Sequence, residues 1–201
     1  MRRISHLKRA AEPVLLAVVI FAAIPHCSAS RPYPLLMPPP TKNAGHLVAT
    51  RSYTFKVYLP LADAFTLFEP VGEKKWAEGF DPVFATPESS TLGDDSIFTV
   101  EASHGGVKHQ TIWLVTRYDR AAALVEYRAI YPGVRVARIT VQCRASAESE
   151  TTVGVTYRYT GLSADGDDYI AAMTEGKFGE LIEKWNSAIG AYLARGTPAV
   201  P

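Results

Sequence analysis

The sequence has few cysteines and almost no excess of either charge. Two cysteines among 201 residues, Cys27 and Cys143, exclude a disulfide-rich scaffold and a four-cysteine zinc site. A net charge of +1 does not provide the concentrated basic surface that nucleic-acid binding requires. Because 47% of the residues are hydrophobic, the chain is not of the disordered type. The composition predicts an ordinary globular protein that does not bind nucleic acid.

The common catalytic motifs are also missing. The sequence has no G-x-S-x-G, H-E-x-x-H, C-x-x-C, P-loop or G-x-G-x-x-G motif. These absences argue against the usual hydrolases, zinc proteases, thiol oxidoreductases and nucleotide-binding enzymes. We therefore predict no cofactor.

The longest apolar run, at residues 14–24, covers about half of the ~20 residues that span a bilayer. Basic residues precede it and small residues follow it up to Ala29, an order typical of a secretory signal peptide. We expect residues 1–29 to be cleaved, which would leave a periplasmic or extracellular protein without a permanent membrane span. An uncleaved anchor or a lipoprotein remains an alternative, although His26 before Cys27 fits a lipoprotein signal poorly. Translation starting at Met37 would instead leave the protein in the cytoplasm.

Residues 30–45 are rich in proline, which is unfavourable for helices and for sheet hydrogen bonds. We interpret this segment as a linker or arm before a folded domain at residues 46–195 and a tail at residues 196–201. Cys143 would be the only cysteine of the mature protein.

Hydrophobic periodicity within the folded domain predicts an α+β protein. Short helical segments are expected at residues 61–68 and 73–78, and one long helix at residues 163–193 with Ser163 as its N-cap. Because the loops between the strands are short, the strands should form an antiparallel meander. The expected strands are residues 46–59, 82–86, 96–102, 110–119, 122–131, 134–143 and 151–160.

Three segments resemble the SRPBCC superfamily, which includes START lipid-transfer domains, the birch-pollen allergen group and polyketide cyclases. They are AFTLFEPVGEKKWAEGFDPVF at residues 64–84, TIWLVTRYD at 111–119 and TTVGVTYRYTGLSADGDDYI at 151–170. The resemblance implies a helix-grip fold, in which a curved antiparallel sheet of about six to seven strands wraps around a long C-terminal helix. It also implies two short helices after the first strand and a cavity between the sheet and the long helix.

Strand alternation, fixed by the charged residues, indicates which side chains face that cavity. Arg117 is expected to face solvent, and Trp113 with it. We expect Trp76 of the short helical segments and Met173 and Phe178 of the long helix to close the pocket. The candidates from the strands are Ile112, Leu114, Thr116, Val125, Tyr127, Tyr131, Val155, Tyr157 and Tyr159.

Apolar walls with a few phenol hydroxyls suit a small hydrophobic or lipid-like molecule, so we predict a binding or transfer protein. The competing interpretation is that the same aromatic residues only form the core. A cyclase- or dehydratase-like enzyme is an alternative function, but it needs an acid or base that faces the cavity. For that role the sequence offers tyrosines and His109. A third possibility is an envelope protein that binds a partner through the arm at residues 31–41.

Glu101, His104 and His109 surround a Gly-Gly hairpin turn and are weak candidates for metal ligands. Their spacing fits no standard ligand pattern, so we predict no metal site. Cys143 is expected to be a small buried hydrophobic residue rather than a nucleophile. Arg135, Arg138 and Arg144 are expected on a solvated face.

Overall fold

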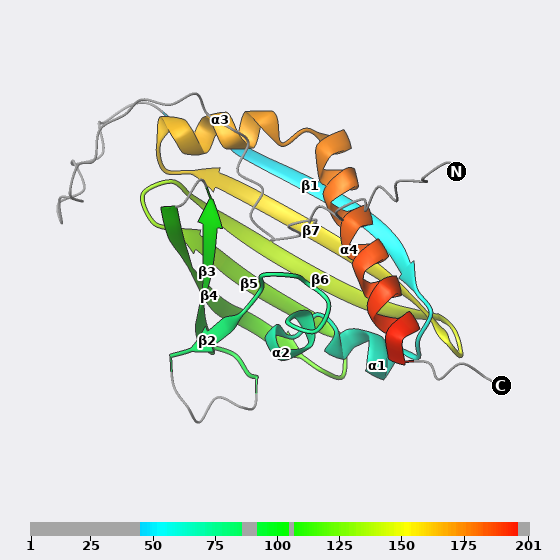
Figure 1. Ribbon diagram of the computed structural model, residues 1–201. Helices are drawn as coiled ribbons and strands as arrows, with labels where there is room; N and C mark the ends of the chain where they lie inside the picture. The colour runs from blue at the N-terminus through cyan, green and yellow to red at the C-terminus, as the bar shows by residue number, and fades with distance from the viewer. Residues whose placement is uncertain (1–44, 86–91, 105–106, 197–201) are drawn as a thin grey trace, which may run out of the picture.

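The computed structural model describes residues 45–85, 92–104 and 107–196, which form one antiparallel sheet with helices over one face (Figure 1). The predicted signal peptide, nearly all of the proline-rich arm, Met37 and residues 197–201 lie outside the described residues. No described helix combines the length and the apolar character of a membrane span.

The sheet of the described residues has seven strands in the order β1-β7-β6-β5-β4-β3-β2. The strands from β2 to β7 follow one another as a meander, and β1 pairs with β7, so that Tyr53 lies opposite Val155. Pro132 and Gly133 form the predicted turn between β5 and β6, with Gly133 at φ +72°. The strands are β1 (Val48–Val57), β2 (Pro82–Phe84), β3 (Ile97–His104), β4 (Val107–Asp119), β5 (Leu124–Tyr131), β6 (Arg135–Ala147) and β7 (Glu150–Gly161).

Two short helices, α1 (Leu61–Thr66) and α2 (Pro70–Glu73), follow β1. The second helical segment was predicted at residues 73–78, which is too late in the chain, because α2 ends at Glu73. Pro70 begins α2 rather than ending a helix, because the first helical position needs no N–H donor. A Cβ atom added to Gly72 would lie 1.8 Å from the carbonyl oxygen of Thr66, so only glycine allows α2 to pack against the end of α1.

The prediction of one unbroken helix at residues 163–193 is wrong, because the chain forms α3 (Ala164–Ala172) and α4 (Glu175–Gly196). Ser163 caps α3 as predicted, accepting a hydrogen bond from the Gly166 N–H. At the break, the carbonyl of Met173 accepts a 2.7 Å hydrogen bond from Nε of Arg51 on β1. The Thr174 hydroxyl accepts a hydrogen bond from the N–H of Lys177 and starts α4.

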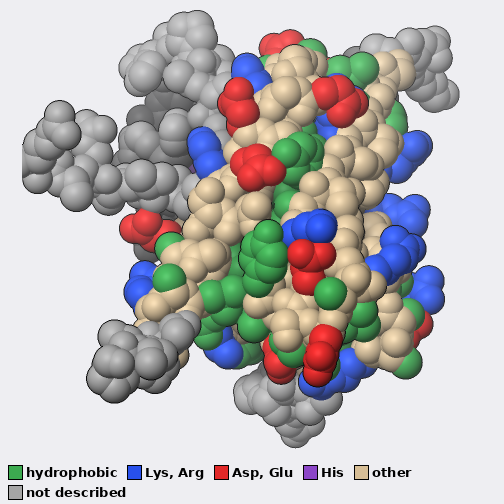
Figure 2. All heavy atoms as spheres, turned by 90° about the vertical axis from the view of Figure 1, so that its right-hand side faces the viewer, with side chains coloured by type: hydrophobic (Ala, Val, Ile, Leu, Met, Phe, Trp, Pro, Cys, Tyr) green, Lys and Arg blue, Asp and Glu red, His purple; other side chains and the backbone are tan. Residues whose placement is uncertain are grey.

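Helix α4 lies across the inner face of the sheet (Figure 1). Its buried residues recur three or four positions apart, which is the pattern of a helix with one apolar face. They are Phe178, Leu181, Ile182, Trp185 and Ile189. Figure 2 shows that acidic and basic side chains are interspersed on the face of the molecule that it presents. The sheet and α4 therefore enclose an apolar core, and most of the charged side chains lie on the outside, with Glu73 and Arg135 as buried exceptions.

Candidate functional site

A small cavity lies in the core between the sheet and α4. It has about 10 Å³ of space open to the centre of a water-sized sphere, which is room for about one water molecule. The resemblance to the superfamily implied a cavity between the sheet and the long helix. In this protein large side chains fill most of that space. Its walls come from the α1–α2 segment, four strands and α4, and consist of Phe68, Glu73, Trp113, Tyr127, Ile139, Val141, Tyr157 and Trp185.

Glu73, the last residue of α2, is the ionisable acid of this wall. Its side chain is only 8% exposed. Within the described chain, the carboxyl group has neither a side-chain hydrogen bond nor an ion pair. Burial raises the pKa of Glu73 to about 8, because the apolar surroundings penalise the charged form. An acid with such a pKa can hold or release a proton near neutral pH.

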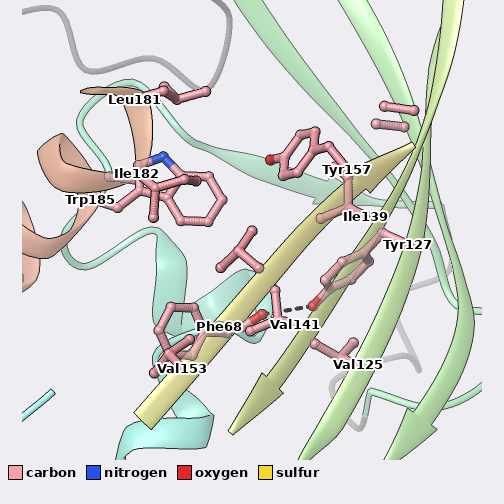
Figure 3. Packing of buried hydrophobic residues seen from close by; sticks show 14 of the residues in the cluster. Phe68, Val125, Tyr127, Ile139, Val141, Val153, Tyr157, Leu181, Ile182 and Trp185 are labelled. Atoms are coloured by element: carbon pink, nitrogen blue, oxygen red, sulfur yellow. Dashed lines mark hydrogen bonds between the residues drawn. The ribbon is translucent and has the colours of Figure 1, made fainter. Parts of the chain in front are cut away.

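Two hydrogen bonds hold the segment that carries Glu73 in place. The hydroxyl of Tyr127 on β5 donates to the carbonyl oxygen of Phe68 at 2.8 Å (Figure 3). The indole N–H of Trp76 donates to the carbonyl oxygen of Leu67 at 2.7 Å. Both carbonyl groups belong to the link between α1 and α2, so these bonds fix the link against the sheet and against the turn after α2.

Two further polar groups of the cavity wall have no hydrogen-bond partner among the described residues. They are the hydroxyl of Tyr157 and the indole N–H of Trp113. Burial raises the pKa of Tyr157 well above its usual value, so its hydroxyl stays protonated. Buried polar groups in proteins are normally hydrogen-bonded, so these two groups are available to form hydrogen bonds with a molecule that enters the cavity.

The aromatic rings of the wall cross one another at steep angles. The rings of Trp113 and Tyr127 lie 5.8 Å apart at 78°, and those of Tyr157 and Trp185 lie 6.3 Å apart at 63°. Figure 3 shows Trp185 on α4 across the interior from Tyr127 and Tyr157, with the Tyr157 hydroxyl directed toward α4. The cavity therefore has aromatic walls on the sheet side and on the helix side.

The predicted orientation of Ile112, Leu114 and Thr116 is wrong. A β-bulge between Val115 and Arg117 reverses the alternation of inward and outward side chains. The exposed position of Arg117 therefore does not indicate on which face of the sheet the preceding residues lie. Trp113 and Val115 are buried on the inner face. Ile112 and Leu114 pair with the outer residues Ile130 and Arg128 of β5. Likewise, the hydroxyl of Thr116 donates to the Glu126 carboxylate on the outer face.

The other predicted cavity residues are in the interior, but only some line the cavity. Tyr127 and Tyr157 belong to its wall. The remaining candidates are buried elsewhere in the same core, and their contact with a ligand stays a prediction. They are Trp76, Val125, Tyr131, Val155, Tyr159, Met173 and Phe178.

Six wall residues were not among the predicted candidates: Phe68, Glu73, Trp113, Ile139, Val141 and Trp185. Periodicity places Trp185 on the apolar face of the last helix, and alternation places Ile139 and Val141 on the inner face of their strand, but none of the three was named as a cavity candidate. Glu73 begins the charged sequence EKK, which is typical of an exposed turn, and no local signal indicates its burial.

Arg135 is buried rather than solvated, with 1% of its surface exposed. Its guanidinium carbon lies 3.6 Å from the ring centre of Tyr131 and 3.7 Å from that of Tyr169. The planar cation stacks between these rings, which explains how a charged side chain is accommodated here. Arg138 is half exposed and donates to Glu126, as expected for a solvated face.

The structure describes no cluster of three or more histidine, cysteine, aspartate or glutamate side chains placed to hold a metal ion. The side chain of His104 lies outside the described part, and His109 is on β4 near the hairpin turn. Cys143 is buried, as predicted, and burial raises its thiol pKa to about 12. The thiol is therefore protonated at neutral pH.

No protein-family model and no curated protein sequence matches the chain. Solved structures do match. Norcoclaurine synthase from Thalictrum flavum, in complex with dopamine and hydroxybenzaldehyde, has a TM-score of 0.57 and 12% identity over 84% of this chain and 99% of that one. Ara h 8.0201 has a TM-score of 0.55 and 12% identity, covering 73% and 99%.

The Zhui aromatase/cyclase from Streptomyces sp. R1128 has a TM-score of 0.54 and 15% identity, covering 76% of this chain and 98% of that one. These proteins and the present chain share nearly the whole of the sheet and helix arrangement, although their sequences differ widely. With its seven-stranded antiparallel sheet, its short helices after β1 and its long C-terminal helix, the chain has the helix-grip fold of the SRPBCC superfamily.

Proposed function

We propose that the protein binds a small hydrophobic or amphipathic molecule in the cavity between the sheet and α4. The observation that carries this proposal is that Glu73, Tyr157 and Trp113 line one gap in an apolar core, and that the Tyr157 hydroxyl and the Trp113 N–H have no partner among the described residues. An apolar site with a few polar groups is the usual composition of a small-molecule pocket. Norcoclaurine synthase, whose structure is similar to this one, was solved in complex with dopamine and hydroxybenzaldehyde, which supports the proposal.

The polar groups of the wall also restrict the ligand. The wall contains Glu73 but no lysine, arginine or histidine. A fatty acid or other carboxylate would bring a second acid next to Glu73 without a basic partner, which is unfavourable. Among lipid-like molecules, the proposal therefore favours neutral and cationic compounds over anionic ones.

A ligand larger than one water molecule can enter only if part of the wall moves. Each strand of the sheet is hydrogen-bonded to its neighbours, whereas Trp185 and Phe68 lie on segments outside the sheet. We therefore expect ligand binding to displace these two side chains. Because indole fluorescence depends on its surroundings, tryptophan emission should change on binding.

Native mass spectrometry of the protein purified from its own host tests the proposal. A bound molecule should appear as a mass increment that disappears on denaturation. The variant Val141→Leu fills the cavity and should lose the increment. Val136→Leu makes the same change on the outer face of the same strand and should retain it. Ligand-free protein in every preparation, with no small molecule that shifts its melting temperature, would contradict the proposal.

An acid–base enzyme of the cyclase or dehydratase kind is a second candidate function. The sequence alone offered only tyrosines and His109 as inward-facing groups, whereas the structure adds the carboxyl group of Glu73. A carboxyl group with a pKa of about 8 can act as a general acid near neutral pH. Loss of turnover in Glu73→Gln, with ligand binding retained, is the result expected of an enzyme.

We also propose that the protein is exported and acts in the periplasm or outside the cell. The basic and apolar order of residues 1–29 supports this. N-terminal sequencing of the protein from its host should find a start near Ser30, whereas a start at Met37 would contradict export. Deleting residues 31–41 tests the separate idea that the arm binds a partner, because partner binding should then be lost.

A further inference from the structure

The cavity combines three features: one acid, several crossed aromatic rings and space for a group the size of a water molecule. Five of its wall residues are aromatic, and they come from the α1–α2 link, from three strands and from α4. They are Phe68, Trp113, Tyr127, Tyr157 and Trp185. Aromatic rings attract cations to their faces, and this attraction increases when the cation is removed from water.

We propose that this cavity takes the primary ammonium group of a small organic amine, held by the Glu73 carboxylate, the Tyr157 hydroxyl oxygen and the surrounding rings. This inference rests on the proposed function and names its ligand class. The size of the cavity supports it, because an ammonium group occupies about the volume of one water molecule. The remainder of the amine would occupy the space that the displaced side chains leave on binding.

The hydrogen-bond acceptors of the wall suit the three N–H donors of an ammonium group, whereas the Trp113 N–H is itself a donor and takes no part in binding that group. The Glu73 carboxylate provides acceptor oxygens that the described chain leaves unused. The Tyr157 hydroxyl has no partner there and can accept one donor. The Tyr127 hydroxyl donates its own hydrogen to Phe68, so its oxygen can also accept. An ammonium group would thus find acceptors and ring faces on several sides.

The charges around Glu73 agree with a cationic ligand. The titratable groups that face it from the sheet are Tyr127, Tyr131 and Tyr157, and burial keeps the pKa of each above its usual value. They therefore remain neutral across the physiological range. Lys74, next to Glu73 in sequence, is exposed and pairs with Asp81. No cation of the described wall competes for the Glu73 carboxylate.

Binding an ammonium group should release one proton. Glu73 is mostly protonated at pH 7 when the cavity is empty, since its pKa is about 8. A cation beside it favours the carboxylate, so the carboxyl proton passes to the buffer as the ion pair forms. Affinity should consequently rise about tenfold from pH 6 to pH 7 and level off above pH 8, while the amine itself stays protonated.

Isothermal titration calorimetry of the purified protein with benzylammonium, benzyl alcohol and benzoate tests this inference. The three probes share one ring and differ in charge. At pH 7 we expect benzylammonium to bind at least about tenfold more tightly than benzyl alcohol, and benzoate to bind most weakly. Repeating the titration in phosphate and in HEPES, which differ in ionisation enthalpy and contain no primary ammonium group, should reveal release of close to one proton per benzylammonium bound.

The variant Glu73→Gln should lower the benzylammonium affinity by at least about tenfold, abolish proton release and leave benzyl alcohol affinity within about threefold. Glu180→Gln, on the exposed face of α4, is the matched control and should behave like the wild type. If Glu73→Gln fails to fold, Tyr157→Phe replaces it. That variant should lower the affinity for benzylammonium, and this loss should be about threefold to tenfold larger than the loss of affinity for benzyl alcohol.

The outcomes separate the inference from the proposed function. Benzyl alcohol binding as tightly as benzylammonium, without proton release, would overturn the ammonium site and leave the binding function intact. Binding of none of the three probes below about 10 mM would overturn the inference, whereas the proposed function is overturned only if native mass spectrometry also finds no bound molecule. Proton release that persists in Glu73→Gln would also overturn the inference, because another group would then carry the proton.

Discussion

The hydroxyl of Tyr127 on β5 donates a 2.8 Å hydrogen bond to the backbone carbonyl of Phe68, in the link between α1 and α2. This bond joins the middle of the sheet to the segment that ends in Glu73. The cavity therefore depends on a contact between residues far apart in the sequence. The position of its acid is set by the sheet as well as by the local helix.

Removing this bond should destabilise the fold. Tyr127→Phe leaves the buried Phe68 carbonyl without its donor, and we expect the free energy of unfolding to fall by about 1–3 kcal/mol. Tyr58→Phe removes a hydroxyl from a side chain that is 72% exposed and serves as the control. Urea denaturation measures both variants. An unchanged midpoint for Tyr127→Phe would show that the bond contributes nothing to stability.

Glu73 should make the protein less stable as the pH rises. Its pKa is about 8 in the folded state and near 4.5 in the unfolded chain, so only the unfolded state loses the proton between these values. The free energy of unfolding should therefore decrease from about pH 4.5 to pH 8 and then level off. Glu73→Gln should remove this decrease and be roughly 3–5 kcal/mol more stable than the wild type at pH 8.5.

Chemical denaturation at several pH values measures this effect. Glu180→Gln should keep the wild-type profile, because Glu180 is exposed. A wild-type profile in Glu73→Gln would mean that the Glu73 carboxylate is already ionised in the folded protein at neutral pH.

Arg135→Lys should destabilise the protein although it preserves the charge. A lysine ammonium cannot stack as a plane between the rings of Tyr131 and Tyr169. We expect a loss of about 1–3 kcal/mol in the free energy of unfolding, measured by thermal denaturation. Arg138→Lys, on the outer face of the same strand, should change stability by less than about 0.5 kcal/mol. Equal effects of the two substitutions would contradict the stacking argument.

Cys143 should be unreactive while the protein is folded. Its thiol is buried, and burial raises its pKa to about 12, so little thiolate is present at pH 8. In a Cys27→Ser background, labelling with a thiol-reactive disulfide should be slower than in denaturant by a factor on the order of 10² or more. The labelling rate would then report opening of the sheet. Immediate labelling of the native protein would show that Cys143 is accessible.

The order of the elements could be predicted from the sequence, whereas the wall of the cavity could be predicted only in part. Alternation placed Tyr127 and Tyr157 on the inner face, where they are buried. The same argument failed for Trp113, because the bulge at Thr116 depends on pairing with β5 and leaves no mark in β4 alone. The break at Met173 was missed because the gap of five positions between Met173 and Phe178 was read as part of one apolar face, although a continuous face repeats every three or four positions.

Glu73 shows a second reason why sequence patterns were insufficient. A charged residue between a glycine and two lysines is typical of an exposed turn. Its burial results from the close packing of Gly72 against Thr66 and from the sheet that covers the segment. Such contacts depend on distant parts of the chain, and periodicity along one segment does not contain them.

The pairing of β1 with β7 also determines when the fold can be completed. Val48, at the start of β1, lies opposite Thr160 of β7. β1 can therefore pair with β7 only after more than half of the chain has been synthesised. Contacts between such distant residues slow folding, because a long loop must close before they form. During synthesis β1 would remain unpaired, while β3, β4 and β5 can already form hairpins. The completed sheet, and with it the enclosed cavity, is therefore a late product of folding.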